Sequence, residues 1–232
     1  MSNKKNLSVS LTDKERLWGY LYLAAEFLVL PTALYWLTDR LFPGTSDAAV
    51  NFLYYIINFL VICIIFKAFL KRNLGIAKSN LPRTILYILL GLAAYWASNL
   101  LMAKLTYLLM PDFINVNDLG IAAVSRDGYF LMALGTVLLV PTAEECMFRG
   151  LLFRGIYGKS RVAAYLISAL CFCLIHVANY IGSYELPLLA MCFVQYLPAG
   201  LILAWSYEKS NTILTPIAIH TVINAIGIYA MR

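Results

Sequence analysis

Six polar residues of types that take part in hydrolysis lie inside strongly apolar segments of this chain. They are Glu144, Glu145, Arg149, His176, His220 and Asn224. The two histidines are the only ones in the sequence. A charged side chain deep in a lipid bilayer costs about 2.5–3.5 kcal/mol on insertion scales. Since carboxylates and imidazoles move protons in catalysis, we expect these residues to form a site.

The spacing of these residues places several of them on shared helical faces. Residues four apart lie on one face of a helix, as His220 and Asn224 do. Glu145 and Arg149 have the same spacing, so we expect a supporting ion pair between them. Glu144 is rotated by about 100° from its neighbour, which leaves it free to face a cavity. We therefore expect Glu144 to act as a general base on a water molecule.

The remaining polar residues have two alternative roles. In one, His176 shares the water or acts as a general acid, while His220 and Asn224 donate hydrogen bonds to an oxyanion. In the other, Glu144, His176 and His220 bind a zinc ion that keeps one position open for water. The residue types and spacing alone do not choose between these two mechanisms.

The elements that must position these side chains are membrane-spanning helices. Hydrophobic residues make up 62% of the 232 residues and charged residues 13%, whereas about a quarter of a soluble domain is charged. Apolar runs of about 20 residues recur along the chain. We predict an all-α, polytopic transmembrane helix bundle of about seven spans, within a range of six to eight. The predicted spans are 17–38, 50–70, 84–109, 129–151, 162–180, 187–207 and 212–230.

Basic residues predict the orientation of this bundle. Those of the N-terminal tail, of residues 67–83 and of residues 154–161 all fall on one side. We therefore expect a cytoplasmic N-terminus, an external C-terminus and a multi-pass protein of the bacterial plasma membrane. The net charge of +6 is explained by these loops, so no nucleic-acid partner is expected. The site should open toward the cytoplasmic half of the bilayer, although His176 lies about 10 Å deeper than Glu144 by helical rise.

The chain divides into three predicted parts. Residues 1–16 are a cytoplasmic tail, residues 17–110 are N-terminal transmembrane helices, and residues 129–227 are the catalytic core. Glu26 lies inside the first span, where it either functions directly or pairs with another helix. Aromatic residues near the span ends are expected to form an interfacial belt. They are Trp18, Tyr20, Tyr54, Tyr55, Tyr129 and Tyr207.

Three short motifs resemble those of the CAAX protease and bacteriocin-processing family, abbreviated CPBP and also called Abi. PTAEECMFRGLLF resembles its EExxxR motif, FCLIH its FxxxH motif and HTVIN its HxxxN motif, in the family's order. The resemblance covers residues 129–227. It implies an integral-membrane endopeptidase, similar to the type II enzymes that cleave prenylated CAAX proteins. Bacterial relatives are associated with peptide processing and bacteriocin immunity.

The resemblance also implies residue roles. Glu144 and His176 would activate the water, and His220 and Asn224 would line the oxyanion site, with the predicted ion pair in support. It favours a metal-free glutamate protease without a cofactor, with zinc as the alternative. The substrate would be a membrane-associated peptide or a lipidated protein. One departure is that Gly200 is followed by an alanine where the family commonly has a second glycine four residues on.

Two other functions remain open at this point. The first is a non-catalytic membrane immunity or scaffold protein that binds a peptide or partner through the same cavity. A small proton-coupled transporter is the other alternative, since buried carboxylates and histidines also form proton relays. The polar residues cluster in one half of the chain, which disfavours a transporter built from two corresponding halves.

Overall fold

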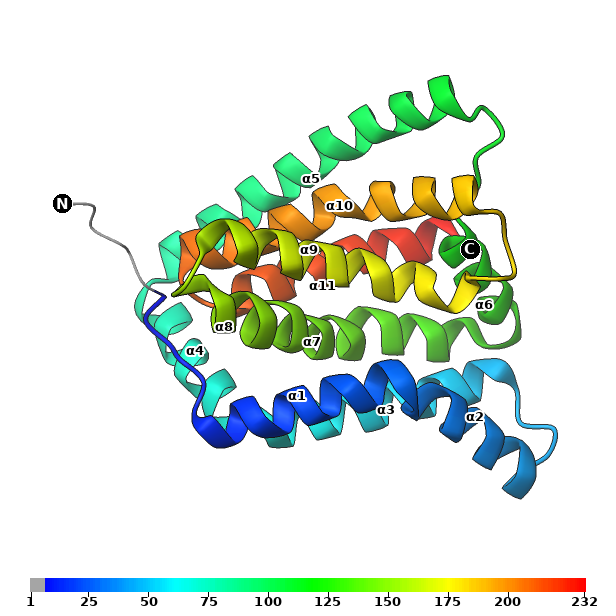
Figure 1. Cartoon of the computed structure of the whole chain (residues 1–232), viewed down its shortest axis with the longest axis horizontal. Helices are drawn as coiled ribbons and strands as arrows, with labels where there is room; N and C mark the ends of the chain where they lie inside the picture. Colours follow the sequence, from blue (N-terminus) through cyan, green and yellow to red (C-terminus); the bar gives the residue numbers. More distant parts are fainter. Residues whose placement is uncertain (1–6) are drawn as a thin grey trace.

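Helices make up nearly all of residues 7–232, the part of the chain that the computed structural model describes, and most run lengthwise along one bundle (Figure 1). The first group is α1 (Asp13–Leu28), α2 (Leu30–Leu41), α3 (Asp47–Ile65), α4 (Lys67–Ser79) and α5 (Leu81–Leu109). The second group is α6 (Val116–Leu134), η1 (Gly135–Leu139), α7 (Val140–Glu145), η2 (Cys146–Phe153), α8 (Arg154–Tyr157), α9 (Arg161–Val177), η3 (Ala178–Tyr180), α10 (Leu186–Ser210) and α11 (Leu214–Ala230). The predicted all-α class is confirmed.

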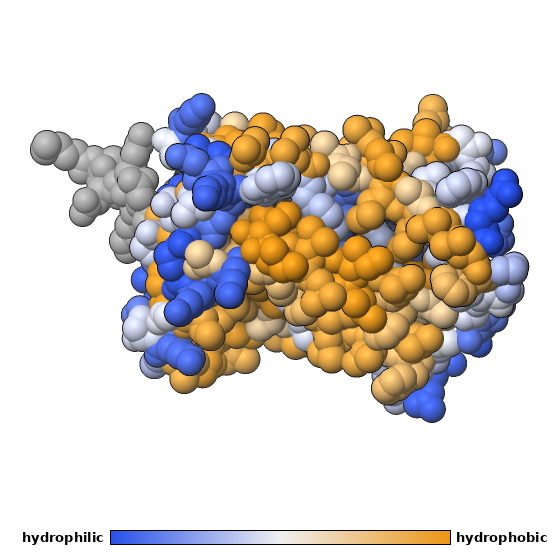
Figure 2. All heavy atoms as spheres, turned by 90° about the horizontal axis from the view of Figure 1, so that it is seen from below, coloured by the Kyte–Doolittle hydropathy of each residue, from blue (hydrophilic) through white to orange (hydrophobic). Residues whose placement is uncertain are grey.

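The predicted membrane spans all fall on helices. Five helical runs are long and apolar enough to cross a membrane: α3, α5, the continuous run from α6 to α8, α9 and α10. Helices α1 and α2 qualify together as one bent span, and α11 is a shorter apolar helix. Figure 2 shows an apolar surface between two polar ends of the molecule. The chain is therefore a multi-pass membrane protein.

Two segments differ from the prediction. Residues 71–83 were expected to form a loop, but most of them belong to α4, a helix with a low share of apolar residues. The helical run that contains the predicted fourth span, 129–151, begins 13 residues earlier, at Val116, and has a non-helical backbone at Gly128. The polar residues of 116–127 hid this extension, since they interrupt the apolar run by which spans are recognised.

The first predicted span is broken. Helices α1 and α2 meet at Val29 and are bent by 58°. Pro31 lies in the first turn of α2. Backbone N–H groups in the first turn make no hydrogen bond within the helix, so a proline, which has no N–H, is tolerated there. This break separates α1, which packs along the bundle, from α2, which diverges from it (Figure 1).

Residues 7–12 pack against the bundle instead of forming a free tail. Leu7, Val9 and Leu11 are buried in the main apolar core. The guanidinium of Arg154 donates hydrogen bonds to the carbonyl oxygens of Val9 and Leu7. Helix α1 then starts at Asp13 with a capping box. The remainder of the predicted tail, residues 1–6, lies outside the described residues.

The two ends of the bundle are distinct. The chain enters α1 at one end, the N-terminal end, and leaves α11 at the other, the C-terminal end (Figure 1). The connections α4–α5, α8–α9 and α10–α11 lie at the N-terminal end (Figure 1). Most of the basic residues used above to predict orientation lie in α4 or in the helix ends beside these connections. The cytoplasmic location of this end stays a prediction.

Candidate active site

A cavity of about 740 Å³ contains the predicted catalytic residues. Glu144 of α7, His176 of α9, and His220 and Asn224 of α11 all contribute to its wall. The structure therefore brings together four side chains that are up to 80 positions apart in sequence. His176, which helical rise placed about 10 Å deeper than Glu144, lines the cavity because the cavity extends to the C-terminal end of the bundle, near the end of α9. It lies on the same face of α9 as Phe172. That ring contacts both histidines, at centroid distances of 4.7 Å to His176 and 5.8 Å to His220.

The glutamates lie on a short helix between two π-helical segments. Helix α7 is only six residues long, and η1 and η2 flank it on either side. π-helical turns widen the backbone spiral and often mark functional sites. Pro141 lies in the first turn of α7. The proline is visible in the sequence, but the π-helical segments are not, because the apolar pattern does not distinguish π-helical from α-helical backbone.

Glu145 forms a buried charge cluster behind the cavity. Its Oε1 accepts a hydrogen bond from Arg149 Nη1 at 2.9 Å, and both side chains are 0% exposed. The same oxygen lies 2.9 Å from His220 Nδ1. Because an ionised carboxylate beside an arginine only accepts hydrogen bonds, Nδ1 of His220 carries the proton. The predicted Glu145–Arg149 pair is present, and it also sets the tautomer of His220.

Arg149 connects this cluster to α10. Its Nη2 donates a hydrogen bond to the carbonyl oxygen of Gly200 at 3.0 Å. Its guanidinium also lies 4.5 Å from the ring centroid of Phe172, a cation–π distance. Arg149 therefore braces three helical segments at once, which goes beyond the local role predicted from its spacing.

Glu144 faces the cavity, and one of its carboxylate oxygens makes no hydrogen bond among the described residues. Its Oε2 lies 3.9 Å from His220 Nε2, beyond a hydrogen bond, and the carboxyl side chain is 13% exposed. That oxygen is buried and has no hydrogen-bond partner among the described residues. A buried carboxylate oxygen left unpaired is costly. The arrangement suits an oxygen that hydrogen-bonds to a water molecule or a substrate.

His176 and Asn224 each keep one functional group free. His176 Nδ1 lies 2.7 Å from the carbonyl oxygen of Phe172, so it donates, and Nε2 is left as an acceptor. Its ring stacks on Tyr196 at 4.2 Å between centroids. Asn224 donates one amide N–H to the carbonyl oxygen of Thr136 at 2.9 Å, which leaves its second N–H available.

The residues proposed as zinc ligands do not fit a metal site. Within residues 7–232, no group of three or more His, Cys, Asp or Glu side chains is arranged to hold a metal ion. Glu144, His176 and His220 share the cavity wall, and the Phe172 ring contacts both imidazole rings. The metal alternative therefore finds no support in the geometry of these side chains.

Sequence reasoning missed much of the cavity wall. Tyr54 and Tyr55 were assigned to an interfacial belt, but α3 begins at Asp47, so both lie two turns inside it and line the cavity. Tyr207 is 1% exposed and belongs to the apolar core instead of the interface. Asp118 and Tyr196 also line the cavity and were not recognised. Of these additional wall residues, only Glu26 could have been found from the sequence, because a carboxylate inside an apolar span indicates a functional site.

The direction of the cavity differs from the prediction. Its wall extends to residues at the C-terminal end of the bundle, including Tyr35, Asn51, Asp118, Tyr180 and Met231. The residues that line it include none from the connections at the N-terminal end. The expectation that the site opens toward the basic end is therefore wrong. Apolar patterning places helices in a membrane but does not show where polar side chains leave space between them.

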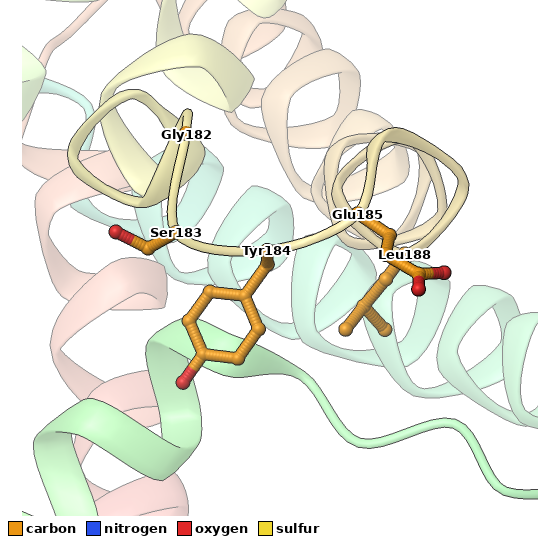
Figure 3. A pocket seen from close by; sticks show the side chains of 5 residues that line it. All are labelled: Gly182, Ser183, Tyr184, Glu185 and Leu188. Atoms are coloured by element: carbon orange, nitrogen blue, oxygen red, sulfur yellow. The ribbon is translucent and has the colours of Figure 1, made fainter.

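A second hollow lies at the surface, in the turn between α9 and α10 (Figure 3). Gly182, Ser183, Tyr184, Glu185 and Leu188 line it. Figure 3 shows Ser183 and Tyr184 projecting from the turn in different directions. With one carboxylate and no histidine, it lacks the residues for hydrolysis, and the larger cavity is the candidate active site.

Comparison with known proteins agrees with the motifs of this site. Residues 126–226 match the family model described as type II CAAX prenyl endopeptidase Rce1-like. The match covers 101 of the 232 residues, so it is this region that is similar to members of that family. The resemblance to CPBP-family intramembrane proteases is thereby confirmed. The matched region starts in α6 and ends in α11, so it contains all six predicted site residues and leaves α1 to α5 outside it.

One curated relative is similar over part of the chain. The UPF0177 protein YxdF of Lactococcus lactis subsp. lactis (strain IL1403) is 32% identical over 95 residues. Those residues are 41% of this chain and 47% of that protein, so the match spans about half the length of the relative. No solved structure matches the chain significantly.

Proposed function

We propose that this protein is an intramembrane endopeptidase in which Glu144 activates a water molecule to hydrolyse a peptide bond. The observation that carries the proposal is the contrast between two adjacent glutamates. Glu145 is fully buried and engaged by Arg149 and His220, whereas Glu144 Oε2 faces the cavity unpaired. The match of residues 126–226 to the family model of type II CAAX prenyl endopeptidases supports the same activity.

The hydrolysis proceeds by general base catalysis. Glu144 accepts a proton from water as the water oxygen bonds to the carbonyl carbon of the scissile amide. That proton then passes to the amide nitrogen as the C–N bond breaks, which yields a carboxylic acid and an amine; transfer of the acid's proton to the amine gives a carboxylate and an ammonium. His176 Nε2, an acceptor, helps to orient the water.

The oxyanion formed in this step needs hydrogen-bond donors. The second amide N–H of Asn224 is one donor, as its first is held by the Thr136 carbonyl. His220 is the other when Nε2 is protonated, because its Nδ1 proton is committed to Glu145. Such preorganised donors typically contribute a factor of about 10²–10³ in kcat each.

The substrate is a membrane-associated peptide or a lipidated protein. The site lies within helices that span the membrane, so the scissile bond must enter the bilayer region. The proposed reaction uses no cofactor. Lipidated CAAX-type sequences and peptide precursors are the two substrate classes to test.

The decisive experiment measures peptide cleavage by purified protein in nanodiscs. Wild type, Glu144→Gln and His220→Ala are compared on prenylated C-terminal peptides and on peptide precursors, with and without a strong chelator. We expect Glu144→Gln to lower kcat by about a hundredfold or more, the scale of general base catalysis. Glu185→Gln, which neutralises an exposed glutamate in the α9–α10 turn, is the matched control and should cleave normally.

Each outcome has a distinct meaning. Cleavage that survives the chelator but is lost in both variants supports the metal-free mechanism. Loss on chelation with recovery on zinc addition contradicts it. If no peptide is cleaved and both variants keep their biological activity in the parent cell, the protease proposal is abandoned in favour of a binding or immunity role.

A further inference from the structure

A third carboxylate lines the cavity and takes no part in the hydrolysis described above. Glu26 lies on α1, outside the region that matches the family. It is only 3% exposed. Its Oε1 accepts hydrogen bonds from the Tyr54 hydroxyl and, at 2.9 Å, from Asn58 Nδ2. Its Oε2 is buried and has no partner among the described residues.

The neighbours of Glu26 fix its orientation. The Tyr22 hydroxyl donates to Asn58 Oδ1 at 3.1 Å, so the amide group of Asn58 is held with its N–H toward Glu26. These contacts link α1 to α3 and occupy one carboxylate oxygen completely. The second oxygen is thus the acceptor that remains for a ligand, and leaving it empty costs free energy.

The cavity around Glu26 is acidic. Asp118, at the start of α6, also lines it and accepts a hydrogen bond from the Tyr196 hydroxyl at 3.2 Å. Neither Glu26 nor Asp118 belongs to a salt bridge within residues 7–232. The residues that line the cavity include these two carboxylates and Glu144 but no lysine or arginine. Several tyrosine rings complete the wall, and aromatic faces attract cations.

We propose that Glu26 binds a cationic group, an ammonium or a guanidinium, of the peptide that enters this cavity. The inference rests on the proposed function only in that the cavity receives a peptide. Asp118, nearer the C-terminal end, would attract the same charge on its way in. A free α-carboxylate, such as the one that ends a CAAX sequence, would meet no lysine or arginine among the residues that line the cavity. Glu26 is thus a specificity residue for positively charged peptides.

The test uses matched peptides that differ only in charge. A neutral, apolar peptide that the wild type cleaves is remade with one lysine scanned along it and, in parallel, with acetyl-lysine at the same positions. Free and acetylated N-termini form a second pair, which distinguishes an α-amino group from a side-chain ammonium. We expect kcat/KM to favour the lysine peptide about tenfold or more at one position, the scale of a hydrogen bond to a charged group.

The variant Glu26→Gln retains the oxygen that Tyr54 and Asn58 contact but removes the charge. We expect it to lose the preference for the charged peptide while cleaving the acetylated peptide as the wild type does. The ratio of the two rates is the readout, because misfolding would lower both alike. Asp39→Asn, which neutralises an exposed carboxylate on α2, is the matched control and should keep the preference.

A binding measurement separates this inference from the protease proposal. The Glu144→Gln protein, in which Glu26 is intact, is titrated with fluorescein-labelled versions of the same peptides. A lower Kd for the charged peptide that disappears in Glu144→Gln/Glu26→Gln supports the inference even if nothing is cleaved. Equal Kd values for charged and acetylated peptides overturn it even if both are cleaved. An equal loss of affinity for the charged and the acetylated peptide in Glu26→Gln also overturns it, since that would indicate a structural role for Glu26.

Discussion

At the scale of single residues, the site depends on one oxygen atom that serves two partners. Glu145 Oε1 accepts from both Arg149 and His220, and none of the three side chains is more than 5% exposed. A charge left alone in such a place is far more costly than a charge that is paired. The stability of the catalytic core and the tautomer of His220 therefore depend on the same ion pair.

This dependence predicts a non-additive pair of substitutions. Arg149→Met leaves the buried Glu145 carboxylate without its cation, so we expect the free energy of unfolding to fall by about 3–5 kcal/mol. Glu145→Gln/Arg149→Met removes both charges, and the amide oxygen still accepts from His220, so most of that loss should be recovered. The measurement is equilibrium unfolding in mixed micelles as a double-mutant cycle. Additive losses would show that the two charges do not stabilise one another.

At the scale of helical elements, the site needs α9 and α10 to approach closely. A Cβ added to Gly200 would lie 3.1 Å from both Cα and Cβ of Ala169. The carbonyl oxygen of Gly200 also accepts the Arg149 hydrogen bond. The family's second small residue is Ala204 here, and it is fully buried. The close approach of the two helices is therefore at Gly200.

Gly200→Val is accordingly expected to separate α9 from α10. The overpacking should destabilise the protein by roughly 1–3 kcal/mol and move Arg149 away from its carbonyl partner, so that cleavage activity falls as well. Gly75→Ala on α4 is the control, because a Cβ there would meet nothing within 4 Å. That variant should be neutral or slightly stabilised by about 0.4–1 kcal/mol. A thermal midpoint unchanged in Gly200→Val would contradict the close packing.

The elements also show how far the sequence could be interpreted. The helices and the shared face of His220 and Asn224 were predictable, since apolar length and a spacing of four residues are local properties. The two π-helical segments around Glu144 were not, because they change backbone geometry without changing composition. The partnership of Glu26 with Tyr54 and Asn58 depends on how α1 packs against α3, for which the sequence has no periodic signal.

At the scale of the whole molecule, the remaining question is which side of the membrane the cavity faces. The basic residues gather at the N-terminal end, which predicts that this end is cytoplasmic. The cavity extends to the opposite end, where α6 begins and α9 and α11 finish. Together these two observations predict a site that receives its peptide from outside the cell, contrary to the cytoplasmic opening expected from the sequence.

Cysteine labelling in spheroplasts of a bacterial host tests this orientation directly. In a protein whose five native cysteines are replaced, single cysteines are introduced at three exposed positions: Lys159 at the N-terminal end, Ser183 at the C-terminal end, and Asn179 in the cavity wall. A membrane-impermeant maleimide should label Ser183→Cys and Asn179→Cys in intact spheroplasts, but Lys159→Cys only after permeabilisation. The reverse pattern would show the opposite orientation, in which the C-terminal end and the cavity face the cytoplasm. Labelling of Ser183→Cys without Asn179→Cys would show instead that the cavity is closed to water, and the hydrolytic water would then have to enter from the bilayer side.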